Sequence, residues 1–131
     1  MKELRIEDIS LGDWVLCKGE YWRISAINEN SVGLRADDDY CVAELIECAA
    51  IYITSEILEK NGLMKVSEEE CYEEYCCNDF LIRRSKFSCT DWWQVDVHYK
   101  QYVAHLSGYI QYVHQLQHLL TINECDKKIK V

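Results

Sequence analysis

The chain has 131 residues, of which 49% are hydrophobic and 28% charged, and its formal net charge is −9. This length and apolar fraction suit one domain, or two small lobes, with a packed interior. The negative charge argues against a protein that binds duplex nucleic acid, because such a protein needs a basic surface for the phosphates. No signal-peptide pattern is present, and no segment approaches the roughly 20 apolar residues of a membrane helix. We therefore expect a soluble, cytoplasmic protein that does not associate with membranes.

Eight cysteines are spread along the chain without any C-x-x-C pair: Cys17, Cys41, Cys48, Cys71, Cys76, Cys77, Cys89 and Cys125. The adjacent Cys76 and Cys77 suit neither a disulfide bridge nor a zinc knuckle. In a cytoplasmic protein, we expect all eight to be reduced thiols that act as small hydrophobic side chains. We expect no metal and no other cofactor.

Short strands with tight turns are predicted for the first 53 residues. The chain contains no proline, so Gly, Asn and Asp supply the turns between the strands. Five strands at this spacing predict a small SH3-like β-barrel or a strongly curved sheet. Trp14 and Trp22 should be at least half buried, because large aromatic side chains anchor small cores. The predicted strands are Trp14–Cys17, Tyr21–Ile27, Ser31–Arg35, Tyr40–Ile46 and Ala50–Ile53.

A short helix with clear end signals follows in "TSEILEKNGL". Thr54 or Ser55 is a suitable N-cap, and Asn61-Gly62 supplies the left-handed residue at which many helices end. Leu63 is then placed to fold back onto the last turn of the helix.

The second half combines strand patterns with one longer helix. Residues 67–70 have the S-x-x-E form of a capping box, although a helix continuing to Cys76 has few core residues. Alternating apolar residues predict strands in "FLIRRSKFSC", "WWQVDVHY" and "QYVAHLSG", and Tyr109–Ile122 has a helical period. The sequence thus predicts an α+β chain. Its parts are an SH3-like unit at 1–53, a linking helix and loop at 54–66, and an antiparallel β-meander packed by a C-terminal helix at 67–131.

The predicted C-terminal helix lacks charge on its polar side. No Asp, Glu, Lys or Arg occurs from Gln101 to Asn123, whereas a helix that faces solvent normally carries charges. Neutral side chains are easier to desolvate than charged ones, so this side suits a contact with another protein or a second copy of the chain. The candidate interaction face consists of Gln111, His114, Gln115 and His118.

The string "IQYVHQLQHLL", together with "GDWVL" and "ITSEILEKNG", resembles a family of small uncharacterised proteins from prophages and conjugative elements of Bacteroides-type bacteria. The resemblance implies a mobile-element origin and a cytoplasmic location. It implies no activity and no catalytic residue.

Three functions are compatible with the sequence. The absence of an assembled catalytic motif favours a non-enzymatic binding module with a protein partner or a homo-oligomeric state. The net charge also suits an acidic decoy that inhibits a host nucleic-acid-binding protein. A metal-dependent enzyme would use His114 and His118 with Cys125, or Asp96 with His98. Asp96 and His98 lie two residues apart on a strand, however, and such pairs are common on solvent-facing sides.

Overall fold

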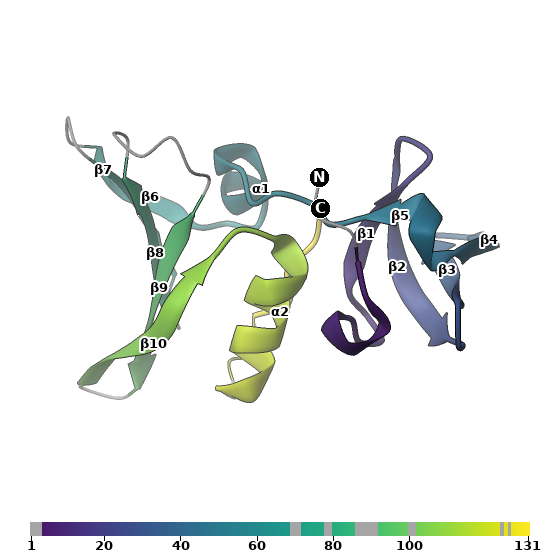
Figure 1. Cartoon of the computed structure of the whole chain (residues 1–131). Coiled ribbons are helices and arrows are strands. Elements are labelled where there is room, and N and C mark those ends of the chain that lie inside the picture. Colours follow the sequence, from purple (N-terminus) through teal and green to yellow (C-terminus); the bar gives the residue numbers. More distant parts are fainter. Residues whose placement is uncertain are drawn as a thin grey trace. The chain divides into compact units, whose positions relative to one another are not determined.

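The structure, a computed structural model, describes residues 4–68, 72–77, 80–85, 92–99, 102–123, 125 and 127–131. The chain forms two compact units, Met1–Ile51 with Val131 and Tyr52–Lys130 (Figure 1). Among the described residues, no helix has both the length and the apolar character needed to span a membrane. Each unit is built around its own antiparallel sheet.

The first unit contains a five-stranded sheet in the order β4-β3-β2-β1-β5. Its strands are β1 (Trp14–Cys17), β2 (Glu20–Ile27), β3 (Ser31–Ala36), β4 (Asp39–Glu44) and β5 (Cys48–Ala49), with 3₁₀ turns η1 (Ile6–Asp8) and η2 (Leu45–Glu47). The β1–β2 hairpin turns at Lys18 and Gly19, whose φ angles are 52° and 80°. Two successive positive φ angles fit the twist of a two-residue hairpin. The predicted turn is therefore confirmed.

One predicted strand in this unit was wrong at its end, and another was misplaced. The strand predicted to reach Ile46 ends at Glu44, because the η2 turn begins at Leu45. Reciprocal hydrogen bonds between Glu44 and Glu47 close a capping box around that turn. The fifth strand is Cys48–Ala49 rather than Ala50–Ile53. Strands β4 and β5 form the two edges of the described sheet. The sheet therefore does not close into a barrel, which was one of the two architectures predicted.

The core of the first unit follows the two-residue period of its strands. Val15, Ile24, Val32 and Leu34 are each at most 2% exposed. Trp14 and Trp22 are both mostly buried, as predicted. The sheet therefore has one packed face, and we call the opposite face of this unit its outer face.

The second unit contains another five-stranded antiparallel sheet, in the order β10-β9-β8-β7-β6, and two helices. Figure 1 shows both helices on the same side of this sheet. The α+β class predicted from the sequence is thus correct. The elements are α1 (Ser55–Lys60), β6 (Met64–Glu68), β7 (Tyr72–Cys76), β8 (Phe80–Ser85), β9 (Trp93–Tyr99), β10 (Tyr102–Ile110) and α2 (Val113–Ile122).

Helix α1 has the end signals expected from its sequence. The Thr54 hydroxyl accepts a hydrogen bond from the Ile57 amide at 3.2 Å. At the other end Gly62 has a φ of 78°. The Leu63 amide then donates to the Leu58 carbonyl at 3.1 Å, which is the six-to-one bond of a Schellman motif. Both predicted caps are confirmed.

The segment after α1 is a hairpin rather than a second helix. Ser67 lies in β6, which pairs with β7, so the S-x-x-E pattern that begins at Ser67 does not start a helix. The S-x-x-E pattern carries information only on the start of a helix, and the cross-strand pairing of β6 with β7 overrides it. The meander therefore begins at Met64.

The C-terminal helix begins four residues later than predicted. Tyr109 and Ile110 belong to β10, and Tyr112 is the N-cap of α2. The Gln115 side-chain oxygen accepts hydrogen bonds from the amides of Gln111 at 2.9 Å and Tyr112 at 3.1 Å. These bonds satisfy donors that have no partner inside the helix, which fixes its first turn at Val113.

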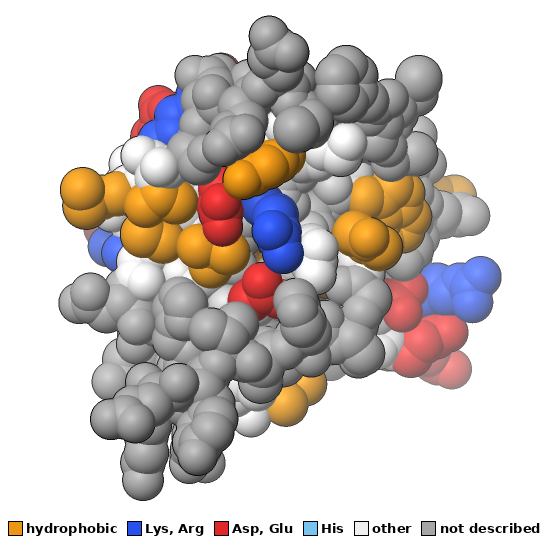
Figure 2. Space-filling view, turned by 90° about the vertical axis from the view of Figure 1, so that its left-hand side faces the viewer, with side chains coloured by type: hydrophobic (Ala, Val, Ile, Leu, Met, Phe, Trp, Pro, Cys, Tyr) orange, Lys and Arg blue, Asp and Glu red, His pale blue; other side chains and the backbone are white. Residues whose placement is uncertain are grey.

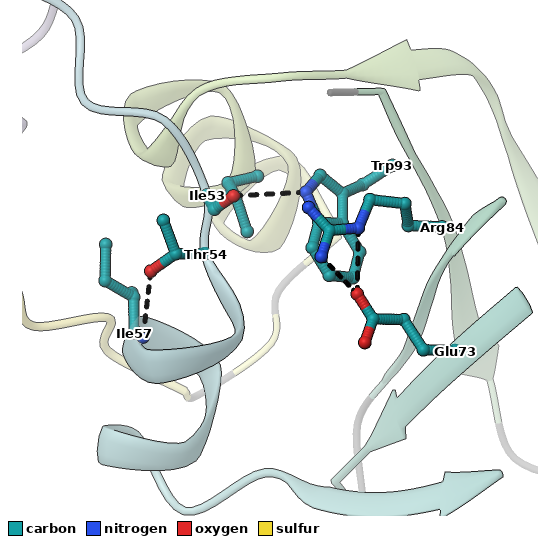
Figure 3. Close-up of polar contacts among 6 residues, drawn as sticks. All are labelled: Ile53, Thr54, Ile57, Glu73, Arg84 and Trp93. Atoms are coloured by element: carbon teal, nitrogen blue, oxygen red, sulfur yellow. Dashed lines mark hydrogen bonds and ion pairs between the residues drawn. The ribbon is translucent and has the colours of Figure 1, made fainter. Parts of the chain in front are cut away.

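The core of the second unit lies between its sheet and its helices. Tyr75, Ile82 and Val95 are direct cross-strand partners and are at most 1% exposed. Trp93 is fully buried, and its indole Nε1 donates to the Ile53 carbonyl at 3.2 Å (Figure 3). The helices contribute the buried side chains of Leu58, Leu116 and Leu120.

Candidate functional site

The histidines of the predicted interaction face lie in a series of ring contacts. His114 is 1% exposed, and its ring stacks on Tyr112 with centroids 5.9 Å apart and planes 17° apart. His118 meets His114 edge-on, with centroids 5.7 Å apart. Tyr52 extends the series through a 5.1 Å contact with Tyr112. His114 therefore packs within the protein.

The other three residues of the predicted face, Gln111, Gln115 and His118, are all half-buried. Gln115 also caps α2 by accepting hydrogen bonds from the Gln111 and Tyr112 amides. Two of the four residues thus stabilise the helix start and its packing, and the role of this face in binding stays a prediction. In the described part of the chain, no three His, Cys, Asp or Glu side chains gather as metal ligands would.

Asp96 does not lie on an open surface, as its place on the strand had suggested. It is 3% exposed, and its Oδ2 lies 3.7 Å from an Arg83 guanidinium nitrogen. Arg83 also stands opposite Glu74 across β7 and β8. Figure 2 shows this side of the second unit, where basic and acidic side chains lie next to one another among hydrophobic ones. The side chain of His98 lies outside the described part, so the predicted Asp96–His98 pair is not placed.

A second charged group occupies the packed side of the same sheet. The Arg84 guanidinium donates two hydrogen bonds to Glu73 Oε1 and lies 4.5 Å from the centroid of the Trp93 ring. Figure 3 shows the Arg84 side chain over the indole. Glu73 is 7% exposed. Because the Glu73 carboxylate is paired with Arg84 and accepts its hydrogen bonds, we interpret this pair as part of the packing of the sheet.

The outer face of the first unit carries a group of side chains that the sequence analysis missed. Cross-strand pairing places Trp14 opposite Arg23, Arg23 opposite Arg35, and Arg35 opposite Tyr40. The four residues form a continuous row over β1, β2, β3 and β4 on the outer face. We call them the arginine–aromatic row.

Each arginine of the row lies on an aromatic ring. The Arg23 guanidinium is 5.8 Å from the centroid of the Trp14 ring, and that of Arg35 is 5.9 Å from the Tyr40 ring. Arg23, Arg35 and Tyr40 are exposed. Such contacts contribute about 0.5–1 kcal/mol at exposed sites, so they help to hold the guanidinium groups over the sheet.

Glycine in β3 makes room for the Tyr40 ring. A Cβ atom built at Gly33 would lie 2.9 Å from the Tyr40 hydroxyl oxygen and 3.3 Å from the Ser25 hydroxyl oxygen. Gly33 has no direct pairing with Tyr40, since its partner on β4 is Val42. The Tyr40 side chain thus reaches diagonally across β3 toward β2 while Arg35 contacts its ring.

The sequence contains only a weak signal for this row. A single turn separates Arg35 from Tyr40 in the sequence, and their pairing follows from the predicted hairpin. The pairing of Arg23 with Arg35 depends on the β2–β3 register, which shifts between Ile24 and Ala26. Such an irregularity cannot be read from alternation alone.

Two buried cysteines face each other in the first unit. Cys17 and Cys48 are direct partners across β1 and β5 and are 3% and 6% exposed. Burial, reinforced by interaction with Cys17, raises the pKa of the Cys48 thiol to about 12. A thiol with this pKa is a poor nucleophile at neutral pH. The six cysteines in the described part carry free thiols, and Cys71 and Cys89 lie outside it.

Comparison of the chain with protein-family models, with curated proteins and with solved structures finds no match.

Proposed function

We propose that this protein is a non-enzymatic binding module and that the outer face of its first unit contacts a protein partner. The observation that carries the proposal is the arginine–aromatic row. Arginine and large aromatic residues are enriched where proteins bind one another, and interfaces are depleted in other charged residues. On this face, Arg35 and Tyr40 are exposed and are held in place by neighbours in the sheet.

The proposal includes an SH3-like architecture for the first unit. Three features support it: a β1–β4 meander, a 3₁₀ turn before β5, and pairing of β5 with β1. Because β4 and β5 are the two edges of the described sheet, we propose a strongly curved sheet rather than a closed barrel.

The mobile-element origin and the cytoplasmic location also belong to the proposal. They rest on the resemblance carried by "YVHQLQH". A phage or conjugative protein of this kind would act on a host or element protein, which agrees with a binding function.

Capture experiments with matched variants test the proposal. Tagged wild-type protein and the Arg35→Ala/Tyr40→Ala variant are used to capture proteins from a lysate of the native host, and retained proteins are identified by mass spectrometry. Ile46→Ala is the matched control, because Ile46 is 74% exposed and lies in η2, outside the row. His118→Ala tests the predicted face on α2.

We expect one partner to be retained by wild type, Ile46→Ala and His118→Ala. The Arg35→Ala/Tyr40→Ala variant should lose this partner. A partner lost only with His118→Ala would assign binding to α2 and contradict the proposal. Circular dichroism and thermal unfolding of each variant establish that it is folded.

A further inference from the structure

Two arginines lie opposite each other on the outer face of the first unit. Arg23 and Arg35 are direct partners across β2 and β3, and both are exposed. Like charges directly opposite each other on neighbouring strands are destabilising. Within the described residues, neither side chain takes part in an ion pair, whereas Arg5, Arg83 and Arg84 each lie near a carboxylate. The pair is thus a concentrated positive charge on an acidic protein.

We infer that Arg23 and Arg35 bind carboxylate side chains of an acidic segment in a partner protein. This inference rests on the proposed function and names the chemistry of the partner. A carboxylate between or beside the two guanidinium groups would relieve their repulsion. Guanidinium and carboxylate groups are planar and form paired hydrogen bonds, which gives such contacts both strength and direction.

The aromatic residues prepare the two arginines for binding. Free arginine side chains lose much conformational freedom when they bind a ligand. Here the rings of Trp14 and Tyr40 already restrict the guanidinium groups, so part of that entropy is lost before the ligand arrives. The row therefore favours a ligand that needs directed hydrogen bonds over one that needs only diffuse positive charge.

The surroundings of the row favour carboxylates over nucleic acid. Single-stranded nucleic acid binds by stacking bases on open aromatic faces. The Tyr40 ring instead reaches over Gly33 and carries the Arg35 guanidinium. The adjacent β3–β4 turn and β4 contain Asp37, Asp38, Asp39 and Glu44, which repel a chain of phosphates. A short segment with separate carboxylates can contact the arginines without lying along these acidic residues.

Binding of synthetic peptides tests the inference directly. The probe is a fluorescent peptide with alternating Glu and Val, because an extended chain places every second side chain on one face, roughly 7 Å apart. The control peptide has the same sequence with each Glu replaced by Gln. Fluorescence anisotropy should show affinity for the Glu peptide at least about tenfold higher than for the Gln peptide, the size of one charged hydrogen bond. The difference should shrink at high salt.

Variants of the full chain identify the residues responsible. Arg23→Gln/Arg35→Gln should reduce affinity for the Glu peptide to that of the Gln peptide. The control is Arg5→Gln, because Arg5 is an exposed arginine near Glu7 and should leave affinity unchanged. Arg23→Lys/Arg35→Lys keeps the charge but removes the planar fork, and should give an intermediate affinity. The comparison of the Glu and Gln peptides uses only wild-type protein. It therefore tests the preference for carboxylates even if a variant fails to fold.

Several outcomes would overturn the inference. Equal binding of the Glu and Gln peptides, or full affinity of a folded Arg23→Gln/Arg35→Gln variant, would contradict it. Tighter binding of a single-stranded oligonucleotide of equal charge would assign the row to nucleic acid. Concentration-dependent dimerisation lost in the glutamine variant would assign it to a second copy of the chain. If no peptide binds but the row still retains a partner from lysate, this inference fails while the proposed function stands.

Discussion

Tyr40 and Gly33 are coupled across neighbouring strands, since a Cβ atom at Gly33 would lie only 2.9 Å from the Tyr40 hydroxyl oxygen. The glycine thus permits the ring to lie over the sheet within reach of Arg35. The arginine–aromatic row of the first unit therefore depends on a residue that carries no side chain.

Gly33→Ala should destabilise the first unit by about 1–3 kcal/mol, because the added methyl group overpacks a closely filled site. Urea unfolding gives the change in free energy. In a Tyr40→Ala background the same substitution should cost less, since its closest neighbour is gone. Ala26 and Ser25 also crowd this position, at 3.1 and 3.3 Å, so part of the cost should persist. Equal costs in both backgrounds would contradict the coupling.

Thr54→Ala should destabilise the second unit by about 1 kcal/mol, the usual loss when an N-cap is removed. The Thr54 hydroxyl accepts from the Ile57 amide, and alanine leaves that amide without this partner. Ser55→Ala is the matched control, because Ser55 is the first residue of α1 rather than its cap. A larger loss in the Ser55 variant would show that the N-cap is misassigned.

Cys48 should be the slowest of the described cysteines to react with iodoacetamide at about pH 8. Its thiol is buried and its pKa is raised to about 12, so almost no thiolate forms. Mass spectrometry after a short reaction gives the extent of modification at each site. In urea, Cys48 should react as quickly as Cys77 or Cys125. Rapid reaction in the folded protein would contradict the burial of this thiol.

The raised pKa of the Cys48 thiol predicts that the protein loses stability in alkali. The pKa of Cys48 rises from 9.0 in its unperturbed state to about 12, so between these values the folded state keeps a proton that the unfolded state releases. The contribution of the protonated Cys48 thiol to the free energy of unfolding is complete below about pH 9. It is lost as the pH rises from there through about 12. Urea unfolding of wild type and Cys48→Ala between these limits should show a smaller pH dependence in the variant. A steeper dependence in the variant would reverse the predicted sign.

Breaking the Glu73–Arg84 pair should destabilise the second unit. Arg84→Gln leaves the nearly buried Glu73 carboxylate without its charged donor, at an expected loss of about 2 kcal/mol. The intrinsic fluorescence should also change, because Arg84 lies on the Trp93 ring. A double-mutant cycle with Glu73→Gln measures the coupling. A coupling energy near zero would mean that the two charges do not stabilise each other.

Local end signals made much of the fold predictable. Thr54, Gly62 and Leu63 act on neighbouring backbone groups, and all three have the predicted roles. The start of α2 was missed because Tyr109 and Ile110 fit the apolar side of a helix as well as a strand. Gln115 decides between the two by accepting hydrogen bonds from the amides of Gln111 and Tyr112, a local capping contact that the hydrophobic period does not contain.

The charged sites were harder to predict than the helices. Asp96 has the two-residue spacing of a solvent-facing residue, yet it is buried near Arg83. The Arg23–Arg35 pair depends on a shifted register between strands. Such sites are properties of the assembled sheet, and a linear pattern specifies them only weakly.

Chemical-shift mapping of the full ¹⁵N-labelled chain with the Glu peptide tests most directly whether Arg23 and Arg35 on the outer face of the first unit bind carboxylate side chains. We expect saturable shifts in the amides around Trp14, Arg23, Arg35 and Tyr40, and binding of the Gln peptide that is at least about tenfold weaker. Shifts centred on α2, or no shifts in the arginine–aromatic row, would contradict it.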